Sequence, residues 1–271
     1  ISYLLLWPSN IMKILKLGLI LGGSNAPSGS TDLNFTFSVN TATTGSTTST
    51  QFQMPFKNIG FTTVDVDWGD GNTDTITTWN QAETLHTYSS SGIYTIKIAN
   101  VVNGFAFNNG GDKAKINIVS NCGQLNINTL GAFFGCLNMT WTATDSPTIG
   151  TTDLGSTFRG CTAFNGNINN WDVSSVTNLF AFMYEANSFT GALDGWDIGS
   201  VTSIGYFANG ATITTDNYDA LLVSWEGQSP FVGLTNVNFG NSTFSLGTAA
   251  DTARASLVST YNWTITDGGG I

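Results

Sequence analysis

The first half of the chain carries short runs in which apolar and polar residues alternate. Residues 33–41 read LNFTFSVNT, which has the two-residue period of a strand with one buried face. Similar short runs lie at residues 52–56, 61–79 and 83–100. Within residues 61–79, Gly69 and Gly71 flank Asp70 and supply the backbone freedom of a tight turn. The pattern predicts a β-rich region over residues 33–111.

The second half repeats its apolar pattern every 25 residues. The segment AFFGC at residues 132–136 precedes TFRGC at residues 157–161 by one such period. A fixed period of about 20–29 residues is typical of a leucine-rich-type solenoid, in which each turn buries its apolar face against the next. The pairs predicted to form the buried core are Phe164 and Phe189, Trp171 and Trp196, and Val176 and Val201.

The C-terminal part changes to a helical pattern. Tyr218, Leu221, Leu222 and Trp225 have helical spacing after a predicted helix start at Asp216. A second short helix is expected over residues 249–260, and a last strand over residues 263–266. Because the terminal turns of a solenoid must be covered, residues 212–271 are predicted to form a small α/β cap.

Two stretches resemble known families. The sequence VDVDWGDGNTDTI, followed by LHTYSSSGIYTIKI, resembles the PKD-type domain, with its W-G-D-G turn and its H-x-Y and G-x-Y-x-V strands. The resemblance implies an immunoglobulin-like β-sandwich over residues 33–111 that serves as a spacer or as a carbohydrate- or protein-binding module on extracellular proteins. The matching residues are Trp68, Gly69, Asp70, Gly71, His86, Tyr88, Gly92, Tyr94 and Ile96.

The sequence FNGNINNWDVSSVTNLFAFM at residues 164–183 resembles the BspA-like surface-protein repeat, a relative of the leucine-rich repeat. The next copy departs from that pattern at Thr190 and Gly199. This resemblance covers residues 112–211 and implies a surface protein, in some cases an adhesin, with related chains in phage particles. The predicted fold is therefore mainly β, with a PKD-type sandwich, a short solenoid and the C-terminal cap.

Residues 1–32 are predicted to form an apolar segment and a Gly/Ser/Pro-rich linker. Lys13 and Lys16 precede a short apolar run as in a signal peptide, but no A-x-A motif follows. Polar residues interrupt the run, whereas a membrane span needs about 18 apolar residues. Removal on export and retention as a docked segment are both open, and retention would allow homo-oligomers to form through this segment.

Charge narrows the range of partners. The net charge is −10 with only eight Lys and Arg residues, whereas nucleic-acid binding requires clustered cations. No nucleic-acid partner is expected. Asp67, Asp70 and Asp74 suggest a weak calcium site, but Gly69 stands where the calcium-loop pattern needs a ligand. A hairpin with solvated carboxylates is the favoured interpretation, and no cofactor is expected.

Cys136 and Cys161 occupy the same position in successive repeats. Neighbouring strands lie about 4.8 Å apart, within the span of about 4.4–6.8 Å that a disulfide accepts between Cα atoms. A disulfide therefore fits, although two buried free thiols are favoured, because unpaired cysteine packs as a small apolar side chain.

The sequence has no catalytic motif of the G-x-S-x-G, phosphate-loop or zinc type, so no enzymatic activity is expected. The sequence favours a recognition or adhesion protein, located outside the cell, on its surface or on a virion, that binds a cell-surface protein or polysaccharide. Trp79, Tyr184 and Tyr206 are the candidates for stacking on sugars. The alternatives are a structural component that contacts neighbouring subunits of a virion or filament, and an accessory domain of a secreted enzyme.

Overall fold

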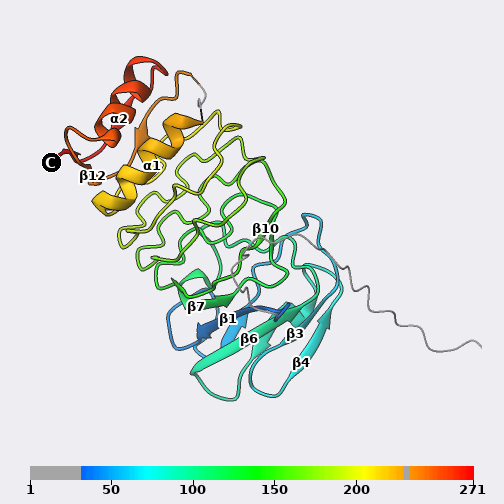
Figure 1. The fold of residues 1–271 in the computed structure, drawn as a ribbon. Coiled ribbons are helices and arrows are strands. Elements are labelled where there is room, and N and C mark those ends of the chain that lie inside the picture. The colour runs from blue at the N-terminus through cyan, green and yellow to red at the C-terminus, as the bar shows by residue number, and fades with distance from the viewer. Residues whose placement is uncertain (1–31, 229–231) are drawn as a thin grey trace, which may run out of the picture.

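A six-stranded sheet forms the N-terminal end of the molecule, and stacked turns lead from it to two helices at the C-terminal end (Figure 1). The computed structural model describes residues 32–228 and 232–271. The segment predicted at residues 1–32 lies outside the described residues except for Asp32. Among the residues described, no helix is long and apolar enough to cross a membrane.

The six-stranded sheet has the order β4-β3-β6-β1-β7-β9. Its pairs are antiparallel except for β7 and β9, which run parallel. A separate antiparallel pair is formed by β2 and β5. The strands are β1 (Phe35–Asn40), β2 (Gln51–Gln53), β3 (Val64–Asp67), β4 (Thr73–Ile76), β5 (Leu85–Thr87), β6 (Ile93–Ala99), β7 (Ile116–Asn121) and β9 (Thr140–Trp141).

Strand β1 differs from its predicted one-sided burial. Thr36 and Ser38 on its polar face are buried together with the apolar residues of the other face. The strand lies between β6 and β7, and the Asn117 amide of β7 donates a hydrogen bond to Ser38 Oγ at 3.4 Å. The alternation predicted the strand correctly but not the cover on its second face, which comes from residues distant in sequence.

The stacked turns are joined by backbone hydrogen bonds in which an amide donates to the carbonyl 24 residues later. Gly131 donates to Gly155 at 3.0 Å, and Phe133 donates to Thr157 at 3.0 Å. The next turn repeats the pattern, with Ser156 to Phe180 at 3.0 Å and Phe158 to Phe182 at 2.8 Å. The 25-residue period of the sequence is thus a register of stacked chain segments, here called the turn ladder.

Aromatic rings fill the interior of the stack. The Phe133 and Phe158 rings stack with centroids 5.7 Å apart, and the Phe164 and Phe189 rings with centroids 5.9 Å apart. All six residues predicted to form the repeat core are buried, namely Phe164, Trp171, Val176, Phe189, Trp196 and Val201. Stacking equivalent positions hides apolar area that a single turn would leave in water.

The sheet and the turn ladder meet without a break at the predicted boundary between residues 111 and 112. Strand β7 pairs with β1 on one side and with β9 on the other. On the other side of the boundary, the Phe107 amide donates to the Ala132 carbonyl at 3.0 Å. Buried residues from both halves form one continuous core. The predicted sandwich and repeat regions therefore share a sheet and a core.

The C-terminal residues extend the ladder and cover it. Tyr206 donates to the carbonyl of Asn236 at 2.8 Å, and Val237 to that of Thr264 at 3.0 Å. Helix α1 (Thr215–Gly227) buries its apolar residues against the stack, and Trp225 Nε1 donates to the Leu193 carbonyl at 3.2 Å. The remaining elements are the helix α2 (Ala249–Ser259), the short helices η1 (Ala82–Thr84) and η2 (Lys113–Lys115), and strands β8 (Asn126–Ile127), β10 (Thr148–Ile149), β11 (Val237–Asn238), β12 (Thr243–Phe244), β13 (Ile265–Thr266) and β14 (Gly269–Gly270).

A fully buried ion pair connects the loop after β1 to the junction between the six-stranded sheet and the turn ladder. Lys115 Nζ lies 3.7 Å from Asp112 Oδ1, and neither side chain is exposed. The ammonium group also donates to Thr47 Oγ1 at 2.7 Å and to the Gln51 carbonyl at 2.8 Å. Asp112 accepts from the Gln53 amide at 2.9 Å. Burial lowers the pKa of Lys115, and the Asp112 carboxylate opposes that shift.

The substitution Asp112→Ala should lower the free energy of unfolding by about 3–5 kcal/mol, because it leaves the Lys115 ammonium buried without a counter-charge. Urea unfolding followed by tryptophan fluorescence measures the loss. Lys97→Ala is the matched control, because Lys97 is an exposed cation on β6. A loss below about 1 kcal/mol for Asp112→Ala would show that the carbonyl ligands alone satisfy the ammonium group.

Candidate functional site

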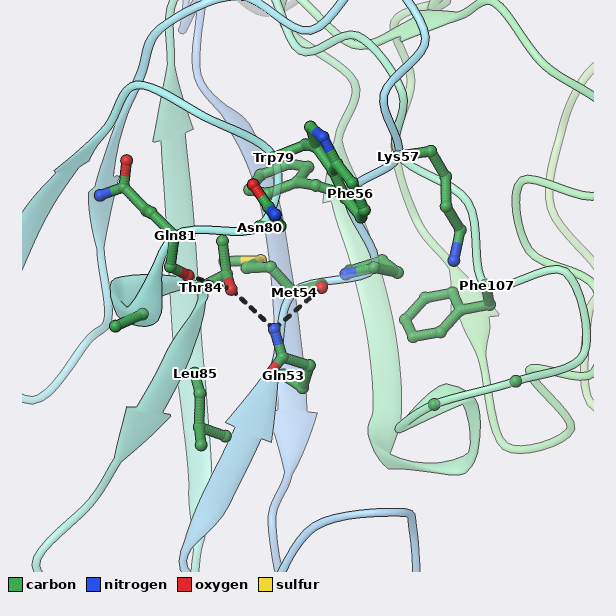
Figure 2. Close-up of a pocket in the computed structure, with 14 residues that line it drawn as sticks. Gln53, Met54, Phe56, Lys57, Trp79, Asn80, Gln81, Thr84, Leu85 and Phe107 are labelled. Carbon is green, nitrogen blue, oxygen red and sulfur yellow. Dashed lines mark hydrogen bonds between the residues drawn. The ribbon is translucent and has the colours of Figure 1, made fainter.

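A pocket opens where the loops of the N-terminal sheet meet the first turn of the ladder (Figure 2). Its walls come from residues 53–57, 79–82, 84–85, 107 and 110–111, and its volume is about 560 Å³. We call it the Trp79 pocket. Three segments distant in sequence converge there because β2 pairs with β5, while Ala106 donates to the Pro55 carbonyl at 3.0 Å.

Trp79 provides the exposed ring of this pocket, with 38% of its surface accessible. Its loop is held by Gln81, whose Oε1 accepts from the amides of Thr77 at 2.6 Å and Thr78 at 3.1 Å. The ring is thus carried on a braced loop. Phe56 and Phe107, which line the pocket beside it, are almost entirely buried.

The polar side chains of the pocket are amides, the Thr84 hydroxyl and the Lys57 ammonium group. Gln53 Nε2 donates to Thr84 Oγ1 at 2.8 Å, which turns the Gln53 side chain across the pocket as in Figure 2. Asn80 and Lys57 also line it. No carboxylate, imidazole or thiol belongs to its lining. This chemistry suits hydrogen bonding to hydroxyl groups beside an aromatic ring.

The other two aromatic candidates lie together on the stack. The rings of Tyr184 and Tyr206 are 6.4 Å apart, and Phe180 packs edge-on to Tyr206 at 5.8 Å. The guanidinium carbon of Arg159 lies 5.0 Å from the centre of the Tyr184 ring. With Ala181, these residues line a hollow of about 320 Å³, which we call the Arg159 hollow.

The sequence analysis did not single out Arg159 or Phe180. The signal was present, because Phe134, Arg159 and Tyr184 follow one another at the 25-residue period and therefore form a column on the stack. Lys57 and Gln53 of the Trp79 pocket belong to no recognisable sequence motif, so the sequence analysis did not select them either. Their position depends on pairing between strands, which a single sequence does not display.

The acidic hairpin uses its carboxylates internally. Asp67 accepts from the Gly69 amide at 2.9 Å, and Asp74 accepts from Trp68 Nε1 at 2.8 Å. Asp70 pairs with His86 Nε2 at 2.9 Å. Although partial burial acts to raise it, the pKa of Asp70 lies below its usual value because His86 and Asn72 donate hydrogen bonds to the carboxylate.

The three hairpin carboxylates therefore have different partners, and no group of three or more metal-binding side chains occurs in the described part of the chain. The calcium candidate gains no support from this geometry. His86 lies in strand β5 and stacks on Trp68 with ring centroids 4.6 Å apart, so its contacts are those of a strand residue packed on the core.

Cys136 and Cys161 are free thiols in the structure, and both are buried. The Cys161 thiol donates to the Phe133 carbonyl at 3.0 Å, along the stack. Burial raises the pKa of Cys161 to about 12 and also raises the pKa of Cys136. The structure has the pair as buried thiols, without the disulfide that their spacing allows.

Residues 128–228 match a protein family described as "Mycoplasma protein of unknown function, DUF285". The match covers most of the turn ladder and helix α1, and it supports the surface-repeat resemblance of this part of the chain. It does not reach residues 33–111, so the PKD-type resemblance rests on the sequence alone. No curated protein and no solved structure matches the chain significantly.

All three cysteines should resist alkylation by iodoacetamide in the native protein at pH 8, because they are buried and their pKa values are raised. They should react once guanidinium unfolds the chain. Mass spectrometry counts the labels. Fast labelling of the native protein, or an increase of two hydrogen masses on reduction, would contradict the buried free thiols.

Proposed function

We propose that this protein is a non-catalytic recognition protein that binds a glycan of a cell surface through the Trp79 pocket. The observation that carries the proposal is the exposed Trp79 ring, which is held by a braced loop above amide side chains. An indole ring packs against the C–H face of a sugar, while amides and an ammonium group bond to its hydroxyl groups. The volume of about 560 Å³ lies within the range of small-ligand sites.

Display outside the cell is the second part of the proposal. It is supported by the family match over residues 128–228 and by the resemblance of the repeats to surface proteins. The low proportion of charged residues, 10%, is consistent with a surface solvated by hydroxyl and amide groups. Roles as a virion or filament component, or as an accessory domain of a secreted enzyme, remain predictions of the sequence.

We also propose that the two halves follow the families they resemble. The presence of a six-stranded sheet and a separate β2–β5 pair supports this proposal, because a PKD-type sandwich consists of two sheets. The turn ladder supplies the repeat geometry of a leucine-rich-type solenoid. In such a protein the loops at the junction of the two halves are free to vary and to carry a ligand site.

Trp79→Ala should weaken glycan binding about 30-fold, because truncating a central aromatic anchor costs about 2 kcal/mol. A glycan array probed with the full chain identifies the ligand, and calorimetry on the best ligand measures the change. Trp79→Phe keeps a ring and should lose less affinity.

The matched control is Ile93→Ala, which removes an exposed apolar side chain of β6 away from the pocket. Binding that survives Trp79→Ala would move the site elsewhere. Binding to cells that is lost after protease treatment and kept after glycosidase treatment would make the ligand a protein.

A further inference from the structure

Arg159 is held in an unusual position for a cation in an acidic chain. Its guanidinium carbon lies 5.1 Å from the centre of the Phe134 ring and 5.0 Å from that of Tyr184. Within residues 32–228 and 232–271, its side chain forms no ion pair and no hydrogen bond to protein, so its N–H groups are available to a ligand. The net charge of the chain is −10, yet no carboxylate of the described residues forms an ion pair with Arg159.

The turn ladder creates this arrangement. The Gly135 amide donates to the Arg159 carbonyl at 2.8 Å, and the Gly160 amide donates to the Tyr184 carbonyl at 2.7 Å. These bonds place Phe134, Arg159 and Tyr184 on successive turns of one column. The rings restrict the rotation of the guanidinium group, so less side-chain entropy is lost when it pairs with a ligand.

Tyr206 completes the hollow from a backbone position that does not favour a large side chain. Its φ is 57°, in the left-handed region that costs L-residues with a Cβ atom. The equivalent positions of the three preceding turns hold the small residues Gly131, Ser156 and Ala181, with φ of 66°, 57° and 52°. The fold thus accepts small residues at this position, whereas the turn of Tyr206 carries a ring there.

We propose that the Arg159 hollow binds a carboxylate-bearing sugar residue of an acidic polysaccharide. The planar fork of Arg159 matches a carboxylate, with which it forms two parallel hydrogen bonds. The rings of Tyr184 and Tyr206 offer a face for the C–H groups of the sugar. The volume of about 320 Å³ suits one sugar unit rather than a long segment. This proposal rests on the proposed glycan recognition, at a site separate from the Trp79 pocket.

An acidic peptide is a poorer fit than an acidic sugar. An extended peptide gains affinity from main-chain hydrogen bonds to a free strand edge. Around the hollow these groups are already paired, since the amide of Ala181 donates to Gly205 at 2.8 Å and that of Tyr206 to Asn236 at 2.8 Å. The hollow therefore offers side-chain contacts only, which suits a ligand with ring faces and one charge.

The test compares methyl glucuronide with methyl glucoside, which differ only in the carboxylate, and measures binding to the full chain by NMR titration. The glucuronide should bind, and the glucoside should bind at least about 10-fold more weakly. Added salt should lower the affinity for the glucuronide. Arg159→Gln should lower glucuronide affinity about 10-fold or more, and Arg159→Lys should recover only part of it because the planar fork is lost. Lys97→Gln removes a cation from β6 and should change nothing.

A second variant separates binding from folding. Tyr206→Gly removes the ring and also relieves the left-handed backbone. It should leave the melting temperature unchanged or raise it, while it weakens glucuronide binding. A variant that merely unfolded the site would lower both.

Three results would overturn the proposal: equal binding of glucoside and glucuronide, no glucuronide binding at millimolar concentration, or tighter binding of poly-glutamate than of glucuronate oligomers of equal charge. The last would make the ligand an acidic peptide. Trp79→Ala distinguishes the two sites, because it should weaken binding at the Trp79 pocket about 30-fold and leave glucuronide binding at Arg159 intact.

Discussion

The hydrogen bond from a backbone amide to the carbonyl 24 residues later is the constraint on which most of the molecule depends. Each turn is too short to enclose a core, so it is stable only when its polar backbone and its apolar face are both satisfied by the next turn. The ladder begins at Phe107, whose amide donates to the Ala132 carbonyl, and ends at residues 264–266 of the cap. The sheet and the helices at the two ends close a stack that would otherwise expose unpaired groups.

The repetitive part of this architecture could be predicted from the sequence, and its junctions could not. The pairs Phe164 with Phe189 and Trp171 with Trp196 are visible in the sequence because stacking demands the same side chain at the same position. The pairing of β7 with both β1 and β9 has no such mark. It joins residues that follow different periods, and only the folded chain brings them together.

The candidate sites, too, could be predicted from the sequence only in part. Trp79, Tyr184 and Tyr206 could be selected by residue type as candidate stacking rings, and two of them do lie together. Arg159 was missed because a single cation in a repeat reads as an ordinary surface residue. The candidate binding role of Arg159 depends on the rings one turn before and one turn after it. In a stacked protein, the neighbours that define a site are found one period away in sequence.

Because the turns of the ladder are evenly spaced, the number of turns between two surface sites fixes their separation along its axis. Phe107 lines the Trp79 pocket, and two turns separate its rung from the rung of Arg159. At about 4.8 Å per turn, the ladder spaces these rungs by about 10 Å along its axis. Duplicating the turn between them would lengthen this spacing by one step and would still leave a copy of Phe134 next to Arg159. A polymer that engages both surfaces at once would then be selected by the spacing of its units, because avidity is lost when the geometry forbids simultaneous contact.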